Sequence, residues 1–178
     1  MLEFVLYLLC KLIGGGFMYQ IGDKIFYPMH GAGIIEAIEE KEILGEKQEY
    51  YIINITLKNI KVMIPIDKTD QLIIREVVEP ETLENVLTLM RTKEVDPATN
   101  SYQQRQRTNV EKIKSGDIYE EARVICELTS LSKTKKLGMG DKIMLNNARQ
   151  MLISELMLVK EIPEETAEKL LDETHHLN

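Results

Sequence analysis

Hydrophobic and polar positions alternate along most of the first half of the chain, whereas hydrophobic positions recur every three or four residues in the second half. Alternation is typical of half-buried strands, and the longer period is typical of amphipathic helices. The change of period falls at Pro80. The pattern therefore predicts an α+β protein with two domains, a strand-rich domain over residues 18–79 and an all-helical domain over residues 80–178.

Short strand-like runs follow one another closely in the first domain. Pro28 lacks a backbone N–H and ends the first run, Gly31 and Gly33 allow a sharp turn, and the Leu44-Gly45-Glu46 turn predicts a hairpin. The predicted strands are Lys24–Tyr27, a run beginning at Ile34, Tyr50–Leu57, Lys61–Ile66 and Leu72–Val78. Short strands at this spacing predict a small antiparallel β-barrel of the Tudor or SH3 type.

Helix signals divide the second domain. Asp117 with Glu120 three residues later predicts a capping box that starts one helix. The Gly138-Met139-Gly140-Asp141 stretch interrupts the helical period, and Pro163 suits the first turn of a last helix. The first helix of the domain is expected to bury Leu83, Val86, Leu87 and Met90.

Residues 1–17 stand apart from this pattern. Nine of the ten residues from Phe4 to Ile13 are apolar, but the run is too short to span a bilayer, and Glu3 precedes it where a signal peptide would carry positive charge. Gly14, Gly15 and Gly16 can be encoded by a ribosome-binding sequence placed one codon before Met18. Our hypothesis is that translation begins at Met18 and that residues 1–17 are a non-native extension from an upstream start codon.

Composition adds an expected compartment and a charge balance to this picture. The chain has 178 residues, a hydrophobic fraction of 44% and a formal net charge of −7. Two cysteines, Cys10 and Cys126, form no disulfide framework and no zinc pattern, which favours a reducing cytoplasm. Lys and Arg outnumber Asp and Glu by ten to six between residues 100 and 150, whereas residues 18–79 hold seven against eleven and residues 151–178 two against seven.

Several short motifs together resemble those of one protein family. They are Gly22-Asp23 with Tyr27-Pro28-x-His30-Gly31, Pro65, Asn109-Val110-Glu111-Lys112, Ser115-Gly116-Asp117, Met144-Leu145-x-x-Ala148-Arg149-Gln150, and Glu155-Leu156. In this order they resemble the CarD family of bacterial transcription regulators, also called CdnL, over Met18 to about Asp172. The resemblance implies a barrel that binds the β subunit of RNA polymerase and a helical domain that contacts promoter DNA at the upstream edge of the bubble. Such proteins stabilise the open complex.

The same resemblance suggests which residues meet DNA. Tyr102 stands where family members commonly carry a tryptophan that acts as a minor-groove wedge, and Arg105 and Arg107 match basic positions beside it. The basic patch is extended by Lys112, Lys114, Lys142 and Arg149. The alternatives are that Tyr102 packs at a helix start and that each lysine lies on a solvated helix face. Because few phosphates can be neutralised, binding to free promoter DNA is expected to be weak, with recruitment through polymerase supplying local concentration.

Polymerase binding in the family uses the edge of the barrel, where a partner strand is added through main-chain hydrogen bonds. Lys41 matches a position that is usually basic, Ile43 matches an apolar neighbour, and Met63 stands where some relatives have arginine. Met63 either makes a packing contact with the polymerase or faces the core, because alternation does not say which face of a strand is buried.

Catalysis has no comparable support. His30 lies in a turn without a nucleophile or paired carboxylates, no P-loop pattern is present, and Asp23 suits its turn. His175 and His176 lie in an acidic tail. The expectation is a protein without enzyme activity, metal or cofactor, cytoplasmic and associated with the nucleoid, with no membrane contact, and monomeric. Several aromatic residues are candidates for a methyl-lysine cage, although most are expected in the core: Tyr19, Phe26, Tyr27, Tyr50 and Tyr51. The rival functions are a protein-only adaptor on polymerase and a hydrolase with an unfamiliar site.

Overall fold

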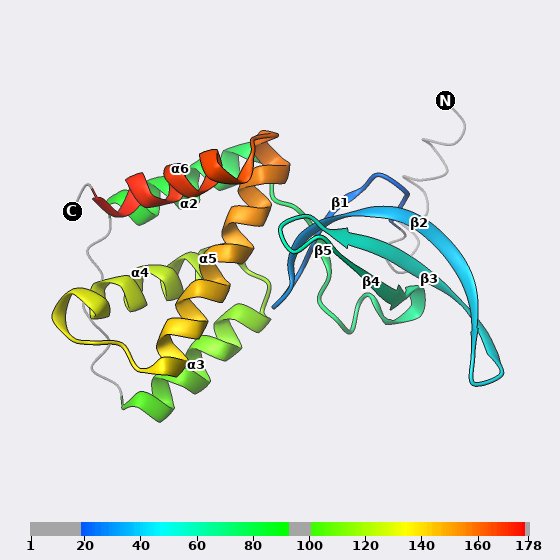
Figure 1. Cartoon of the computed structure of the whole chain (residues 1–178), viewed down its shortest axis with the longest axis horizontal. Helices are drawn as coiled ribbons and strands as arrows, with labels where there is room; N and C mark the ends of the chain where they lie inside the picture. The colour runs from blue at the N-terminus through cyan, green and yellow to red at the C-terminus, as the bar shows by residue number, and fades with distance from the viewer. Residues whose placement is uncertain (1–18, 93–100, 177–178) are drawn as a thin grey trace.

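The computed structural model of the chain describes residues 19–92 and 101–176, with the side chains of the last helix described to Thr174. A sheet occupies one end of the molecule and five helices occupy the other (Figure 1). The predicted extension over residues 1–17 and the side chains of His175 and His176 lie outside the described residues. None of the described helices has the length and apolarity needed to cross a bilayer.

Five antiparallel strands form the sheet in the order β4-β3-β2-β1-β5. Their bounds are β1 Lys24–Tyr27, β2 Gly31–Ile43, β3 Glu46–Ile55, β4 Ile60–Pro65 and β5 Arg75–Glu76. The predicted barrel is not closed, since no ladder joins β4 to β5 within the described residues. The fifth strand is shorter than predicted because turns occupy residues 69–73, and Ile73 has a positive φ of 55°.

The β2–β3 hairpin is longer than the sequence predicted and projects beyond the rest of the sheet (Figure 1). Its predicted turn is confirmed, because Leu44 and Gly45 both have positive φ, 55° and 84°, as tight hairpin turns of the primed type require. Gly31 has a φ of 102°, as expected of a turn residue. Gly33 lies inside β2 instead, where a Cβ atom would approach the Asn54 carbonyl oxygen to 2.5 Å, so it serves close strand packing rather than a turn.

The helices are α2 Pro80–Thr92, α3 Tyr102–Lys114, α4 Ile118–Thr134, α5 Met139–Lys160 and α6 Glu164–His176. Asp117 caps α4 as predicted, since its carboxylate accepts from the backbone N–H groups of Tyr119 at 2.8 Å and Glu120 at 3.4 Å. The reciprocal half of the capping box is not seen, because the Glu120 carboxylate accepts from Arg123 at 2.5 Å. The four apolar residues expected to be buried on α2 are all buried.

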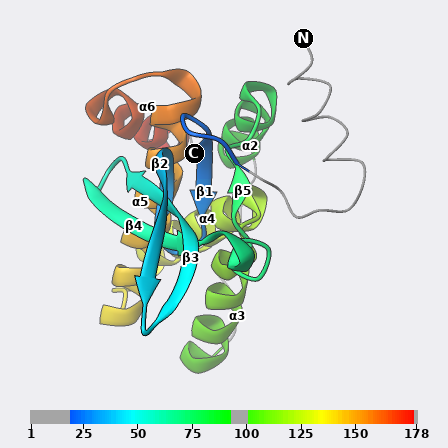
Figure 2. The same ribbon diagram turned by 90° about the vertical axis from the view of Figure 1, so that its right-hand side faces the viewer.

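Two apolar clusters fill the interior. The smaller one lies within the sheet and includes Tyr51, Ile53 and Ile64. The larger one fills the helical part and also takes in Phe26 and Ala32 from the sheet, so the two halves share a core. The strands cross in front of α5 when the molecule is seen from the sheet side (Figure 2), and α5 contacts β2, α4 and α6.

The motifs that carry the family resemblance meet at this junction. Pro28 packs on Gly116, where a Cβ atom would lie 3.2 Å from the proline ring. A Cβ atom on Gly31 would lie 2.7 Å from the Ser154 hydroxyl oxygen, and that hydroxyl accepts from the Ala32 N–H at 2.8 Å. These motif residues therefore hold the sheet against the helices.

A buried ion pair completes the junction. The Arg75 guanidinium donates to both carboxylate oxygens of Glu155, at 2.6 and 2.9 Å, and to the Gly116 carbonyl at 2.7 Å. Its carbon lies 4.2 Å from the centre of the Phe26 ring. Glu155 is fully buried and also accepts from the Val78 N–H at 2.8 Å. The bidentate geometry and the additional hydrogen bonds offset the cost of burying the two charges.

Candidate functional site

Two of the candidate DNA-contacting residues, Tyr102 and Arg105, lie where the N-terminal ends of α3 and α5 meet. Arg105 donates to Asp141 through Nη2 at 2.7 Å and through Nε at 3.3 Å, and Gln106 donates to the same carboxylate at 2.7 Å. Arg105 and Asp141 are only 4% and 2% exposed. Since α3 buries a single apolar side chain, Ile113, besides two polar ones, this buried ion pair is a principal contact between the two helices.

The predicted phosphate contact of Arg105 is not supported by the position of its side chain, which is almost fully buried. Its guanidinium is turned inward to Asp141. Arg107 follows two positions later, and with about 3.6 residues per turn it points to nearly the opposite side of the helix. Its side chain is 85% exposed and pairs with the exposed Glu111 carboxylate at 3.3 Å. Arg107 is thus accessible, and Arg105 fixes the position of α3.

Tyr102 packs against a neighbouring helix start and also remains partly exposed to solvent. Its ring packs across the start of α5, because a Cβ atom on Gly138 would lie 3.8 Å from the ring and one on Gly140 would overlap the hydroxyl. The Arg105 guanidinium carbon lies 5.8 Å from the ring centre. Tyr102 is nevertheless 50% exposed. The side chain is therefore held in place on one side and open to a partner on the other.

The remaining predicted basic residues divide into two groups. Lys112 pairs with Glu127 at 2.7 Å and Arg149 pairs with Asp172 at 2.6 Å, and both cations are largely covered. Lys114 and Lys142 are exposed. The structure does not bring all of these cations into one open patch, because two of them already have carboxylate partners.

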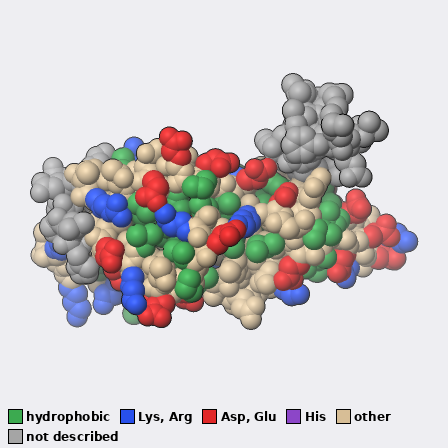
Figure 3. Space-filling model, turned by 90° about the horizontal axis from the view of Figure 1, so that it is seen from above, with side chains coloured by type: hydrophobic (Ala, Val, Ile, Leu, Met, Phe, Trp, Pro, Cys, Tyr) green, Lys and Arg blue, Asp and Glu red, His purple; other side chains and the backbone are tan. Residues whose placement is uncertain are grey.

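Sequence reasoning missed several exposed residues near Tyr102. Lys135 and Lys136 precede the Gly138 corner, and Met139 and Ile143 on α5 are 74% and 54% exposed. Figure 3 shows the opposite face of the molecule, on the side of α2 and α6, where Lys and Arg side chains are interspersed with Asp and Glu over the helical part and Asp and Glu are frequent at the hairpin end. The run of positive charge from Lys133 to Lys136 beside Gly138 is visible in the sequence. Its position near Tyr102 is set by the packing of Tyr102 on Gly138, which the sequence does not show.

The candidate polymerase-binding residues lie at the other end of the molecule. Ladder pairs place Met63 opposite Ile52 and Ile52 opposite Ala37, so Met63 shares the sheet face that carries Lys41 and Ile43 further along β2. Met63 is 50% exposed and absent from both apolar clusters, so it faces outward. β4 pairs with β3 alone and forms an edge of the sheet.

The hairpin around these residues is acidic. Lys41 is 42% exposed and contacts Glu39 at 2.5 Å, and Ile43 is 44% exposed. Five glutamates lie on the two strands of the hairpin beyond the register shift between Ile35 and Ala37, namely Glu39, Glu40, Glu42, Glu46 and Glu49. An edge strand with an exposed methionine, beside an acidic hairpin, can accept an extended segment that carries basic side chains.

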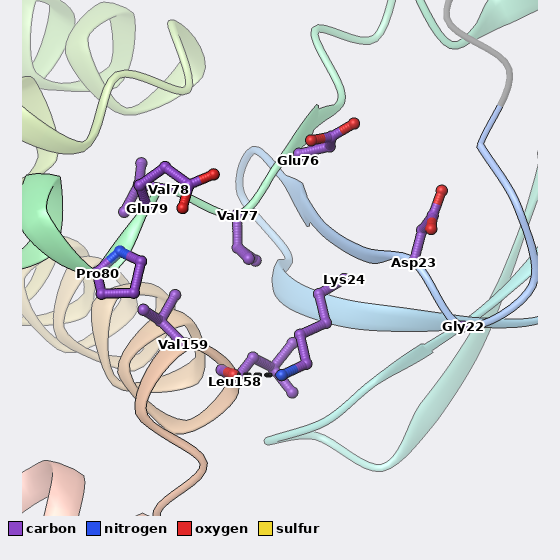
Figure 4. Close-up of a pocket in the computed structure, with 10 residues that line it drawn as sticks. All are labelled: Gly22, Asp23, Lys24, Glu76, Val77, Val78, Glu79, Pro80, Leu158 and Val159. Atoms are coloured by element: carbon purple, nitrogen blue, oxygen red, sulfur yellow. Dashed lines mark hydrogen bonds between the residues drawn. The ribbon is translucent and has the colours of Figure 1, made fainter. Parts of the chain in front are cut away.

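A hollow of about 400 Å³ lies at the junction of the sheet with the helices (Figure 4). Lys24 crosses it and donates to the Leu158 carbonyl at 2.9 Å near the end of α5, and it pairs with Glu161 at 2.9 Å. A cation suits the C-terminal end of a helix. The lining residues are Gly22, Asp23, Lys24, Glu76, Val77, Val78, Glu79, Pro80, Leu158 and Val159, which include no His, Cys or Ser.

Most of the aromatic residues considered for a cage are buried, and His30 stacks on another of them, Tyr27. Tyr19, Phe26, Tyr50 and Tyr51 are buried, as expected of core residues, and burial raises the pKa of Tyr19 to about 12. The His30 ring stacks on Tyr27 with 4.4 Å between ring centres, and burial, with the Lys58 charge, lowers its pKa. Across the described side chains of residues 19–92 and 101–174, no group of three His, Cys, Asp or Glu is arranged to hold a metal.

Two family models match the chain in the order of its two structural parts. The model described as "CarD-like/TRCF RID domain" matches residues 19–78, and the model described as "CarD, C-terminal domain" matches residues 85–172. The chain belongs to the CarD family. This CarD-family chain is also 47% identical to "Putative transcription factor YdeB" of Bacillus subtilis (strain 168) over 147 residues, which cover 83% of the chain and 95% of the relative.

Proposed function

We propose that this CarD-family chain regulates transcription initiation by binding the RNA polymerase β subunit through the edge of its sheet and promoter DNA through its helical end. In this proposal the DNA contact lies at the upstream edge of the bubble and stabilises the open complex. The name of the Bacillus subtilis relative as a transcription factor supports regulation of transcription, and the family model over residues 19–78 supports the polymerase contact.

The observation that carries the proposal is the half-exposed Tyr102, fixed against Gly138 and Gly140 at the helical end. Inserting a side chain at a base step requires partial unstacking of that step, which costs a few kcal/mol in intact duplex. At the bubble edge melting has already opened the stack, so an inserted ring favours the melted state. A ring that the protein holds in place also loses little conformational entropy on insertion.

Charge supports weak DNA binding that depends on polymerase. Exposed Arg107, Lys114 and Lys142 can neutralise only a few phosphates, and the formal net charge of the chain is −7. Affinity for free duplex is therefore expected to be low and to fall steeply with salt. A polymerase contact at the hairpin end would raise the local concentration of the helical end at the promoter. In this proposal the protein acts in the cytoplasm, at the nucleoid, and carries out no catalytic step.

A second candidate function is a protein-only adaptor on RNA polymerase. The burial of Arg105 and the ion pairs of Lys112 and Arg149 favour it, because they remove three of the predicted cations from an open surface. An adaptor would bind polymerase through the same sheet edge and would leave the lifetime of the open complex unchanged.

The test is the lifetime of open complexes formed by cognate polymerase on a ribosomal RNA promoter and challenged with competitor DNA. The full chain is expected to lengthen this lifetime, and Tyr102→Ala is expected to lose most of the effect while polymerase binding persists. An unchanged lifetime with polymerase bound would favour the adaptor. Failure to bind polymerase would overturn the proposed function.

A further inference from the structure

We propose that Met139 is a second insertion residue, which enters the minor groove of promoter DNA together with Tyr102. This inference rests on the proposed DNA contact and adds to it a residue on another helix, 37 positions further along the chain. Methionine is among the apolar side chains that proteins insert between base steps.

The first support is the position of Met139. It is 74% exposed at the start of α5, and its two neighbours, Gly138 and Gly140, are the residues on which the Tyr102 ring packs. The ring thus spans the backbone on both sides of Met139. The Arg105–Asp141 ion pair ties the same two helix starts together. Met139 and Tyr102 are therefore held side by side on one corner of the molecule.

The second support is that the apolar surface continues beyond this pair. Ile143, one turn after Met139 on α5, is 54% exposed. Behind it lies a recess of about 210 Å³, lined mainly by apolar side chains that include Met29, Val110 and Met151. Met139, Ile143 and Met29 are 74%, 54% and 39% exposed, and a group of exposed apolar side chains marks an interaction surface.

Charge identifies nucleic acid as the partner of this surface. Lys135 and Lys136 lie just before the Gly138 corner, and Lys142 lies just after it, all exposed. Arg107 is exposed one turn and a half beyond Tyr102 on α3. Apolar side chains between cations match a minor groove, where phosphates flank the base steps on both sides. The unbranched methionine side chain can adapt to an irregular, partly opened step.

The experiment compares Met139→Ala, Met139→Gln and Met139→Leu with the full wild-type chain in the open-complex lifetime assay, with a fluorescent base analogue placed at the upstream bubble edge. The Ala and Gln variants are expected to reduce the lifetime extension by about threefold and to lower the analogue signal, since Gln keeps the length of the side chain but not its apolar character. Leu is expected to retain both. Thermal unfolding and polymerase binding should match wild type in all three variants, because Met139 is exposed.

A double variant separates joint insertion from independent contacts. If the two side chains enter as one unit, Tyr102→Ala combined with Met139→Ala should lose less than the sum of the two single losses. Full lifetime extension and full analogue signal in Met139→Ala and Met139→Gln would overturn the inference while leaving the proposed function intact. Absence of any extension by the wild-type chain would instead overturn the proposed function and this inference with it. Reduced polymerase binding by Met139→Ala would also overturn the inference about Met139, because the surface around Met139 would then belong to a protein interface.

Discussion

The two ends of the molecule differ in how they expose apolar side chains. At the hairpin end, Met63 lies on an open strand edge near five glutamates, whereas at the helical end Tyr102 and Met139 lie near exposed lysines and an arginine. A strand edge offers main-chain hydrogen bonds to a protein, and an apolar group among cations suits nucleic acid. A net charge of −7 does not determine what each end binds, because a partner interacts with the local charge of the surface that it contacts.

The junction keeps the two ends in a fixed relation. Phe26 and Ala32 belong to the apolar cluster of the helices, and Arg75 bridges to Glu155 on α5. A contact at one end can therefore orient the other end, which a flexible linker would not do. Substitutions at each end and in the region between them test these roles separately.

The largest expected effect is on the helical end itself. Arg105→Ala leaves Asp141 buried without its cationic partner, and loss of one member of a buried ion pair costs about 3–5 kcal/mol of the free energy of unfolding. Urea unfolding measures this loss. Arg107→Ala is the matched control two positions away and should change the stability by less than about 0.5 kcal/mol. Equal stability of the two variants would contradict the structural role assigned to Arg105.

A smaller effect is expected at the hairpin end. Met63→Glu places a charge on the outward face of β4 and should weaken binding to the polymerase β subunit by about tenfold, the scale of a modest interface residue. Titration of labelled protein with polymerase measures the affinity. Ile73→Glu is the control, because Ile73 is equally exposed, at 50%, but lies beside β5. Similar losses for both variants would place the polymerase contact away from β4.

A third prediction concerns the pH dependence of the region that joins the ends. Glu121 on α4 is buried, neither of its carboxylate oxygens has a hydrogen-bond partner, and burial together with the Glu155 charge raises its pKa well above the usual value. A raised pKa in the folded state stabilises the protein at low pH, and that stabilisation is lost as pH rises through the folded-state pKa. Glu121→Gln should therefore be more stable than wild type above that pKa.

Urea unfolding at several pH values checks this prediction. The free energy of unfolding of wild type should fall with rising pH relative to Glu121→Gln, whose amide does not ionise. Glu168→Gln, an exposed change on α6, is the control and should follow wild type. A pH profile of Glu121→Gln that is parallel to that of wild type would show that Glu121 does not titrate in this range.

The smallest expected effect is that of Arg107 on salt dependence. Arg107→Ala removes one exposed cation at the helical end and should lower the slope of log affinity against log salt by about one, in the complex with polymerase and promoter. Arg123→Ala on α4 is a control, since it removes another exposed arginine that is paired with a neighbouring glutamate. An equal change in slope for both variants would indicate a general charge effect rather than a phosphate contact at the helical end.

Sequence reasoning recovered the local features of the fold. The change from strands to helices at Pro80, the turn at Leu44-Gly45 and the Asp117 cap are all observed. Each depends on residues a few positions apart, so a linear pattern can reveal it. The fifth strand was predicted to be longer than it is, and the sheet was predicted to close into a barrel. Both predictions were wrong because the pairing of β4 with β5 depends on the path of the intervening turns and not on alternation.

The candidate site was harder to predict for the same reason. Arg105 and Arg107 are two positions apart and have similar neighbours in the sequence, but Arg105 meets Asp141, 36 residues away, and Arg107 meets solvent. The family motifs identified the chain, yet Pro28, Gly31 and Glu155 build the junction rather than an open surface. The sequence pattern did not identify Met139 as a candidate interaction residue, because its candidacy depends on the ring of Tyr102 beside it.

The residue pattern was enough to identify the family and the order of strands and helices. Only the tertiary structure decided which cations are buried, that the sheet stays open, and that Met139 lies beside Tyr102. The physical reason is that helix and strand periods act over a few residues, whereas burial of a charge requires a partner that folding brings from far along the chain.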